Sequence, residues 1–80
     1  MSNDKPRYWF GSKPTTCDVC QQPIGQEVGD CFVDGATKRG PWALMCLTCW
    51  TSGIGLGKLG GGMGQKYMLV EGGKWLKVEG

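Results

Sequence analysis

The apolar residues of this chain occur in short runs that are separated by glycine, proline and polar residues. Runs of this length, bounded by turn residues, predict strands more readily than long helices. The segment 26–45 has the pattern of a β-hairpin. Its first strand contains Cys31-Phe32-Val33, and we expect Asp34-Gly35 to form the turn that follows. Pro41 makes the return strand an edge or broken strand.

A second β-hairpin is predicted over 65–80. Its last run alternates, with Leu76 and Val78 on one side and Trp75 and Lys77 on the other. Gly72-Gly73 suits a type I′ turn between the two strands, whose exposed edge suits the addition of a partner's strand. A lone hairpin is marginal in water, so this one must pack on the rest of the chain or pair with a neighbour.

The pattern divides the chain into four segments. We expect an extended aromatic arm over 1–16, a module with two cysteine pairs over 17–52, a glycine-rich loop over 53–64 and the C-terminal hairpin over 65–80. A short helix begins at the second cysteine pair and ends at the glycines after it. The pattern therefore predicts a small β-rich α+β domain with hairpins and a short helix.

Four cysteines form two C-x-x-C pairs, Cys17 with Cys20 and Cys46 with Cys49, and 25 residues separate the pairs. Each pair can supply two adjacent corners of a tetrahedral Zn²⁺ site. The chain contains no histidine, so Cys₄ is the set of soft ligands that it favours. One structural Zn²⁺ is predicted. The module over 17–52 is therefore a Cys₄ zinc-binding module, and the fold class is a small zinc-stabilised β-rich α+β domain with a zinc knuckle. A Cys₄ site has no open position for water, and we expect no catalytic residues and no enzyme activity.

Two other interpretations of the cysteines are weaker. A disulfide framework needs an even number of cysteines and an oxidising compartment, whereas this chain has five and begins without the pattern of a signal peptide. A redox C-x-x-C motif belongs near a βαβ pattern, which is not visible here. The fifth cysteine, Cys31, is expected to be a small buried hydrophobe, and an alternate ligand or a reactive thiol are its alternatives.

The length and the charge of the chain further limit the classes of function that it can have. Eighty residues make one small domain with a thin core, which a structural metal would stabilise. The formal charge is +2, and four bound thiolates with one Zn²⁺ would bring it close to zero. That balance disfavours a dominant electrostatic contact with nucleic acid. No apolar stretch is long enough to predict a membrane span.

Several apolar residues are candidates for contact with a partner protein. Aromatic residues are enriched at interface hot spots, and glycine lets a backbone approach another chain closely. The candidates lie in the arm, the glycine-rich loop and the last strand: Tyr8, Trp9, Phe10, Ile54, Leu56, Leu59, Met63 and Trp75. In the alternative interpretation, the arm covers the core and the loop is a flexible connection. Gly57-Lys58-Leu59 lacks the hydroxyl residue of a phosphate-binding loop.

The run Cys17-x-x-Cys20-x-x-Pro23-Ile24-Gly25, followed by a hairpin and by Cys46-x-x-Cys49 at a helix start, resembles a treble-clef zinc finger. That resemblance implies a knuckle that carries the first pair and a helix whose first turn carries the second. Residues 17–67 also resemble small zinc-finger proteins of tailed bacteriophages, through Phe32-Val33-Asp34-Gly35 and Gly40-Pro41-Trp42 among others. This second resemblance implies a virus-encoded protein made in the reducing cytoplasm of a bacterial host.

These observations predict a structural or interaction protein, a minor capsid or tail component that docks on other viral proteins in a multi-chain assembly. A small-molecule substrate and a membrane are not expected. The alternatives are a regulator that binds a host protein and a nucleic-acid-binding zinc finger. In the latter, Lys38, Arg39, Lys58 and Lys66 would contact phosphates while Trp42 or Tyr67 stacks on bases.

Overall fold

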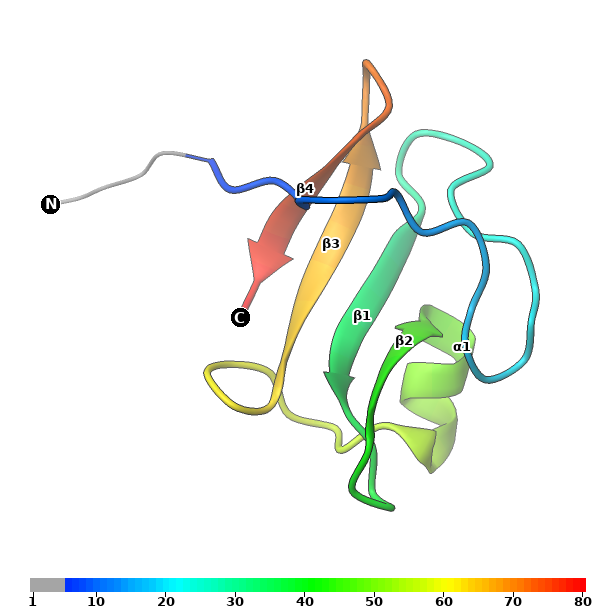
Figure 1. Ribbon diagram of the computed structural model, residues 1–80, viewed down its shortest axis with the longest axis vertical. Helices are drawn as coiled ribbons and strands as arrows, with labels where there is room; N and C mark the ends of the chain where they lie inside the picture. Colours follow the sequence, from blue (N-terminus) through cyan, green and yellow to red (C-terminus); the bar gives the residue numbers. More distant parts are fainter. Residues whose placement is uncertain (1–5) are drawn as a thin grey trace, which may run out of the picture.

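The fold is one antiparallel sheet with a short helix beside it, seen in a computed structural model that describes residues 6–80 (Figure 1). The strands are β1 (Cys31–Ala36), β2 (Trp42–Cys46), β3 (Gly64–Val70) and β4 (Lys74–Glu79), in the order β2-β1-β3-β4. Helix α1 (Leu47–Cys49) continues into a π-helical turn, η1 (Trp50–Ile54). Neither helical segment of this range has the length and apolarity that a membrane crossing requires. The expected small β-rich domain with a short helix is confirmed.

The two predicted hairpins share a single sheet because β1 pairs on both of its sides. Phe32 lies opposite Cys46 of β2 and opposite Tyr67 of β3. The C-terminal hairpin therefore packs on the rest of the chain, as a hairpin that is marginal alone must do. Strand β2 lies at an edge of the sheet and begins directly after Pro41, as expected for a strand next to proline.

The predicted turn at Asp34-Gly35 is wrong, because both residues lie inside β1 and the chain turns between Thr37 and Pro41. Tertiary contacts explain the difference. The Asp34 carboxylate accepts a 2.7 Å hydrogen bond from the Trp42 indole. A Cβ atom on Gly35 would lie 2.8 Å from the carbonyl oxygen of Met63, so glycine allows the backbone there to approach closely.

The turn of the second hairpin is one residue longer than predicted. Val70 pairs with Lys74, so Glu71, Gly72 and Gly73 form a three-residue loop. Gly72 and Gly73 have φ values of 92° and 78°, in the left-handed region that glycine favours. The glycines thus stand where the turn needs them, although the loop differs from the type I′ turn expected.

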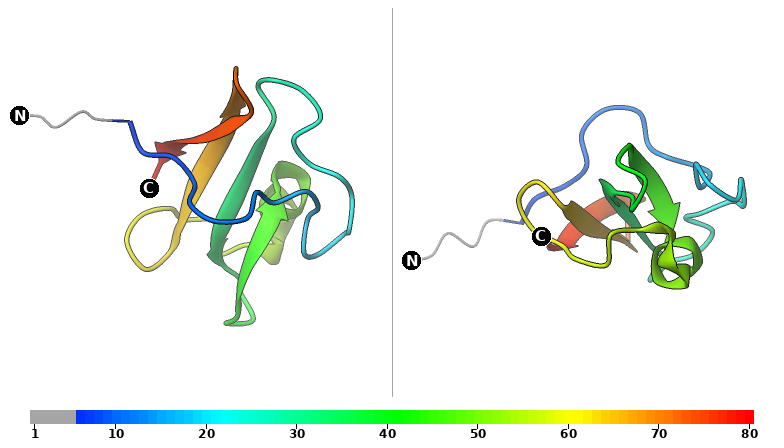
Figure 2. Two further views of the ribbon diagram at one scale, coloured as in Figure 1. Left: turned by 45° about the horizontal axis from the view of Figure 1, so that its top comes forward. Right: turned by 90° about the horizontal axis from the view of Figure 1, so that it is seen from below.

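The sheet buries residues on both faces, because successive residues of a strand point to opposite sides. On one face the Phe32 ring stacks on Tyr67, with ring centroids 5.2 Å apart, and meets the edge of Trp75 at 4.7 Å. On the other face Val33 lies opposite Met45, and both are fully buried. The arm crosses one face while α1 lies on the other (Figure 2).

The arm extends the sheet before it crosses that face. The Lys77 amide donates to the Arg7 carbonyl at 2.7 Å, and the Trp9 amide donates to the Trp75 carbonyl at 3.0 Å. The Trp9 ring then covers Phe32 and Tyr67 edge-on, at centroid distances of 5.4 and 5.3 Å. The outer edge of β4, which we expected to be open to a partner's strand, is occupied by the chain itself. Residues 1–5 of the predicted arm lie outside the described residues.

The glycine-rich segment is hydrogen-bonded to the first hairpin. Leu56 donates to the Ala36 carbonyl at 3.0 Å, and Lys38 donates to the Ile54 carbonyl at 3.0 Å. Ala36 in turn donates to the Met63 carbonyl at 2.9 Å. The close backbone approach that the glycines permit is therefore made to the same chain.

Candidate metal centre

A tight turn before the sheet presents the first cysteine pair. The Gln21 amide donates to the Cys17 carbonyl at 3.0 Å, and the Cys17 amide donates to the Gln22 carbonyl at 2.9 Å. Gln21 has a φ of 64°, the one positive value among the described non-glycine residues. Pro23 follows this turn, so the chain cannot continue as a helix there. The result is the knuckle that the C-x-x-C spacing predicts.

The knuckle is attached to the outer edge of β2 through Asp18. The Asp18 amide donates to the Leu44 carbonyl at 2.8 Å, and the Leu44 amide donates to the Asp18 carboxylate at 3.0 Å. Our sequence reasoning missed this residue. The available signal was an aspartate inside a turn, because aspartate side chains readily accept hydrogen bonds from backbone amides.

The second pair lies where β2 passes into α1. Cys46 is the last residue of β2 and the N-cap of α1, and Cys49 is the last residue of α1. Residues three apart lie on the same side of a helical turn, so both sulfurs face the knuckle. Gly53, with a φ of 102°, interrupts the helical turn that follows. A Cβ on Gly55 would overlap the ring of Trp50, and glycine there lets the chain fold back tightly.

The four sulfurs form a compact cluster in which every pair lies within 4.8 Å. The sulfurs of Cys17 and Cys49 are 3.7 Å apart, as are those of Cys20 and Cys46. A tetrahedral site with Zn–S bonds of about 2.3 Å requires sulfurs about 3.8 Å apart. A disulfide would need about 2.05 Å, and all five cysteines are free. The predicted Cys₄ cluster is confirmed, and it is positioned to hold one metal ion.

Backbone amides stabilise negative charge at the innermost sulfur. Cys17 is fully buried, and its Sγ accepts from the amides of Val19 at 3.4 Å and Cys46 at 3.3 Å. Burial raises the pKa of this thiol, but backbone amides, that of Cys20 included, outweigh burial and lower the pKa to about 6. The fold therefore favours the thiolate that a metal requires at this position.

The opposite corner of the cluster behaves differently. Burial and the neighbouring cysteine sulfurs together raise the pKa of the Cys49 thiol to about 12. Burial also raises the pKa of Cys46. Four sulfurs this close cannot all carry a charge without a cation between them. This electrostatic conflict and the tetrahedral spacing together fit a divalent metal ion.

The remaining candidates from the sequence lie outside the cluster. Cys31 is half-buried in β1, where its Sγ lies 3.5 Å from the Gly29 carbonyl, and it is not among the clustered ligands. Trp75 was expected to contact a partner, but its side chain is only 3% exposed and belongs to the core. The other candidates keep some exposed surface: Tyr8, Trp9, Phe10, Ile54, Leu56, Leu59 and Met63.

Comparison of the chain with protein-family models, with curated proteins and with solved structures gave no match. The fold and the site are therefore interpreted from their own geometry.

Proposed function

We propose that this chain is a non-enzymatic interaction protein whose fold is stabilised by one structural Zn²⁺. The observation that carries the proposal is the closed cluster of four sulfurs with tetrahedral spacing. Cys17, Cys20, Cys46 and Cys49 would fill all four positions around the ion, which is the arrangement of structural rather than catalytic zinc. The order of knuckle, hairpin and short helix supports a treble-clef-like assignment of this module.

The proposed docking surfaces consist of apolar side chains that the fold leaves exposed. Ile54 and Leu56 are 36% and 37% exposed, and backbone hydrogen bonds to the first hairpin hold this segment in place. Phe10 is 91% exposed at the arm. A rigid segment that presents apolar side chains suits a protein partner, because little conformational entropy is lost on docking.

The partners that we propose are structural proteins of a virus particle, and the setting is a bacterial host infected by a phage. This part of the proposal is motivated by the sequence resemblance of residues 17–67, and a regulator of a host protein is its main competitor. Either role uses the same exposed apolar side chains.

Two measurements test the proposal. Metal analysis of the recombinant protein should give about one zinc per chain, and a chain that folds without metal would overturn the structural role of zinc. Mass spectrometry of purified phage particles should find the chain at a fixed copy number. A double variant, Ile54→Ser with Leu56→Ser, should lose incorporation, while Val28→Ser at another exposed apolar position should keep it. Absence from particles would exclude the virion role.

A further inference from the structure

A groove of about 630 Å³ lies between the arm and the C-terminal hairpin, far along the sheet from β2 and the cysteine cluster. We call it the arm groove. Its main lining residues are Arg7, Tyr8, Trp9, Phe10, Tyr67 and Lys77. A space of this size is typical of a ligand site. The groove contributes nothing to the zinc cluster, so its composition needs a separate explanation.

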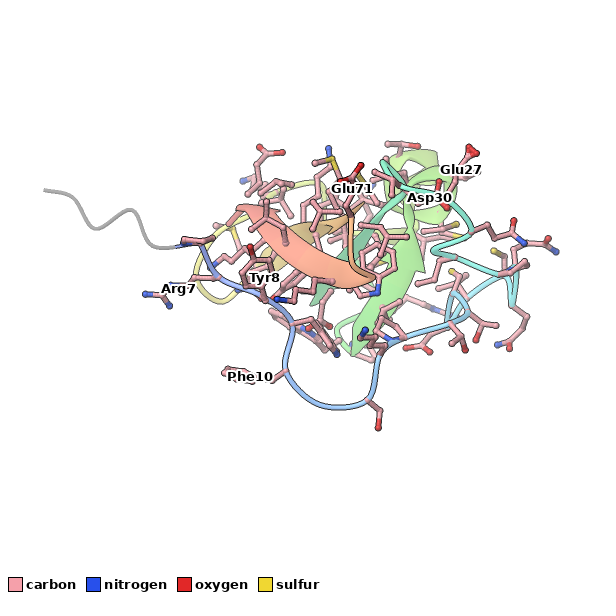
Figure 3. All side chains as sticks on the ribbon, turned by 90° about the horizontal axis from the view of Figure 1, so that it is seen from above. Arg7, Tyr8, Phe10, Glu27, Asp30 and Glu71 are labelled. Carbon is pink, nitrogen blue, oxygen red and sulfur yellow. The ribbon has the colours of Figure 1, made fainter. Side chains whose placement is uncertain are left out.

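The aromatic rings of the arm groove differ in how firmly they are held. Trp9 and Tyr67 are fixed, since they pack edge-on at 5.3 Å and both contact Phe32. Phe10 is 91% exposed and points away from the sheet, and Tyr8 is 41% exposed (Figure 3). Phe10 therefore offers a free aromatic ring on which a planar ligand can stack.

Four of the nine lysines and arginines of the chain lie around these rings. Arg7 and Lys77 line the arm groove, and Lys13 and Lys74 line a hollow next to it. The ammonium of Lys74 lies 5.5 Å from the centre of the Tyr8 ring. Among the described residues that line these two spaces, none carries a carboxylate. The local potential is therefore positive, even though the metal-loaded chain is close to neutral overall.

The nearby acidic groups do not cancel this charge. Glu79 lines a hollow that shares Arg7 and Lys77 with the arm groove, and its carboxylate lies 3.9 Å from Lys66. The Asp34 carboxylate lies near Tyr67, and it accepts a 2.7 Å hydrogen bond from the Trp42 indole. Glu27, Asp30 and Glu71 lie away from Arg7, Tyr8 and Phe10 (Figure 3). Lysine and arginine side chains thus outnumber the carboxylates around the exposed aromatic rings.

We propose that the arm groove binds single-stranded nucleic acid, with its cations on the phosphates and its rings stacked on the bases. Stacking platforms beside a positively charged groove are the common basis of sequence-tolerant single-strand binding. A duplex cannot use the rings because its bases are already stacked. A proline-rich peptide could pack on the rings but has no use for the cations. This inference goes beyond the proposed function and does not depend on it.

The test measures fluorescence anisotropy of a labelled oligothymidine with the zinc-loaded, full-length protein. Phe10→Ala should weaken binding by about fivefold to a hundredfold, the range for loss of one stacked base. Replacing Arg7 and Lys77 by glutamine should lower the slope of log affinity against log salt by about 1.4, since each phosphate contact on a single strand contributes about 0.7. Phe10 and Arg7 are exposed and Lys77 is half-buried. An unchanged zinc content and an unchanged circular dichroism spectrum would verify that each variant keeps its fold.

The matched control replaces Lys38 and Arg39 by glutamine, which removes the same charge from the loop between β1 and β2. We expect this variant to bind like the wild type. Equal weakening by both double variants would overturn the proposal, because binding would then reflect overall charge. No binding of the oligonucleotide at low salt, or preference for a duplex or a proline-rich peptide, would also overturn it.

Discussion

Removal of one zinc ligand is the sharpest perturbation of this fold, and Cys17→Ser is the best choice. Cys17 is fully buried, and its sulfur accepts hydrogen bonds from backbone amides of the knuckle and of the end of β2. A serine hydroxyl stays protonated and is a poor zinc ligand, so the variant loses one corner of the tetrahedron and the main acceptor for these amides.

The expected loss is large compared with the stability of such a chain. At roughly 0.05–0.15 kcal/mol per residue, 80 residues give about 4–12 kcal/mol, and structural zinc contributes about 10–16 kcal/mol of apparent binding free energy. Mutation of outer-shell partners already costs up to about 100-fold in metal affinity. Loss of a ligand should cost at least that, or about 3 kcal/mol, which lowers the melting temperature by about 12 °C or more.

Cys31→Ser is the matched control, because it makes the same substitution at a cysteine outside the cluster. We expect it to keep one zinc per chain and to change stability by less than about 1 kcal/mol. Zinc content and thermal unfolding by circular dichroism measure both variants. If Cys17→Ser kept its zinc and melted within a few degrees of the wild type, the assignment of the metal centre would be refuted.

Three further predictions concern the sheet. Gly35→Ala should destabilise the fold by about 1–3 kcal/mol in urea unfolding, because its Cβ would meet the Met63 carbonyl, whereas Gly61→Ala, in open space, should be neutral or slightly stabilising. Trp9→Ala should cost about 2 kcal/mol through its two edge-on ring contacts, while Phe10→Ala should cost less than about 0.5 kcal/mol. Burial and a neighbouring carboxylate raise the pKa of Tyr67, so its neutral form stabilises the fold below about pH 10. That stabilisation should be lost as the pH rises through the raised pKa, and urea unfolding of Tyr67→Phe should lack this dependence.

The features that sequence reasoning predicted correctly have local causes. The C-x-x-C spacing determines which sulfurs can meet, and Pro23 and the glycines after Cys49 determine where helix cannot continue. Short apolar runs located both hairpins, and alternation with the paired glycines Gly72-Gly73 located the second. Each of these signals lies within a few residues of the structure that it specifies.

The errors arose where a residue is explained by a partner that is distant in sequence. Asp34-Gly35 is a common turn sequence. Here it lies within a strand, where Asp34 accepts a hydrogen bond from Trp42 and Gly35 leaves room for the Met63 carbonyl. Trp75 belongs to a residue type that is enriched at interfaces, yet its side chain is buried against Phe32. The order of the strands depends on contacts across the whole sheet. The pattern of apolar and polar residues alone therefore does not predict it.

The order of the sheet also limits how a protein partner can dock. The knuckle uses the amide and carbonyl of Leu44 at the β2 edge, and the arm uses backbone groups of Trp75 and Lys77 at the β4 edge. A partner strand could extend the sheet only by displacing the knuckle or the arm, and displacement of the arm would remove Trp9 from the Phe32 and Tyr67 rings. Protection of both edges is a common defence against edge-to-edge aggregation. A protein partner should therefore dock on side chains, and substitutions at Ile54 and Leu56 should weaken docking more than truncation of the arm.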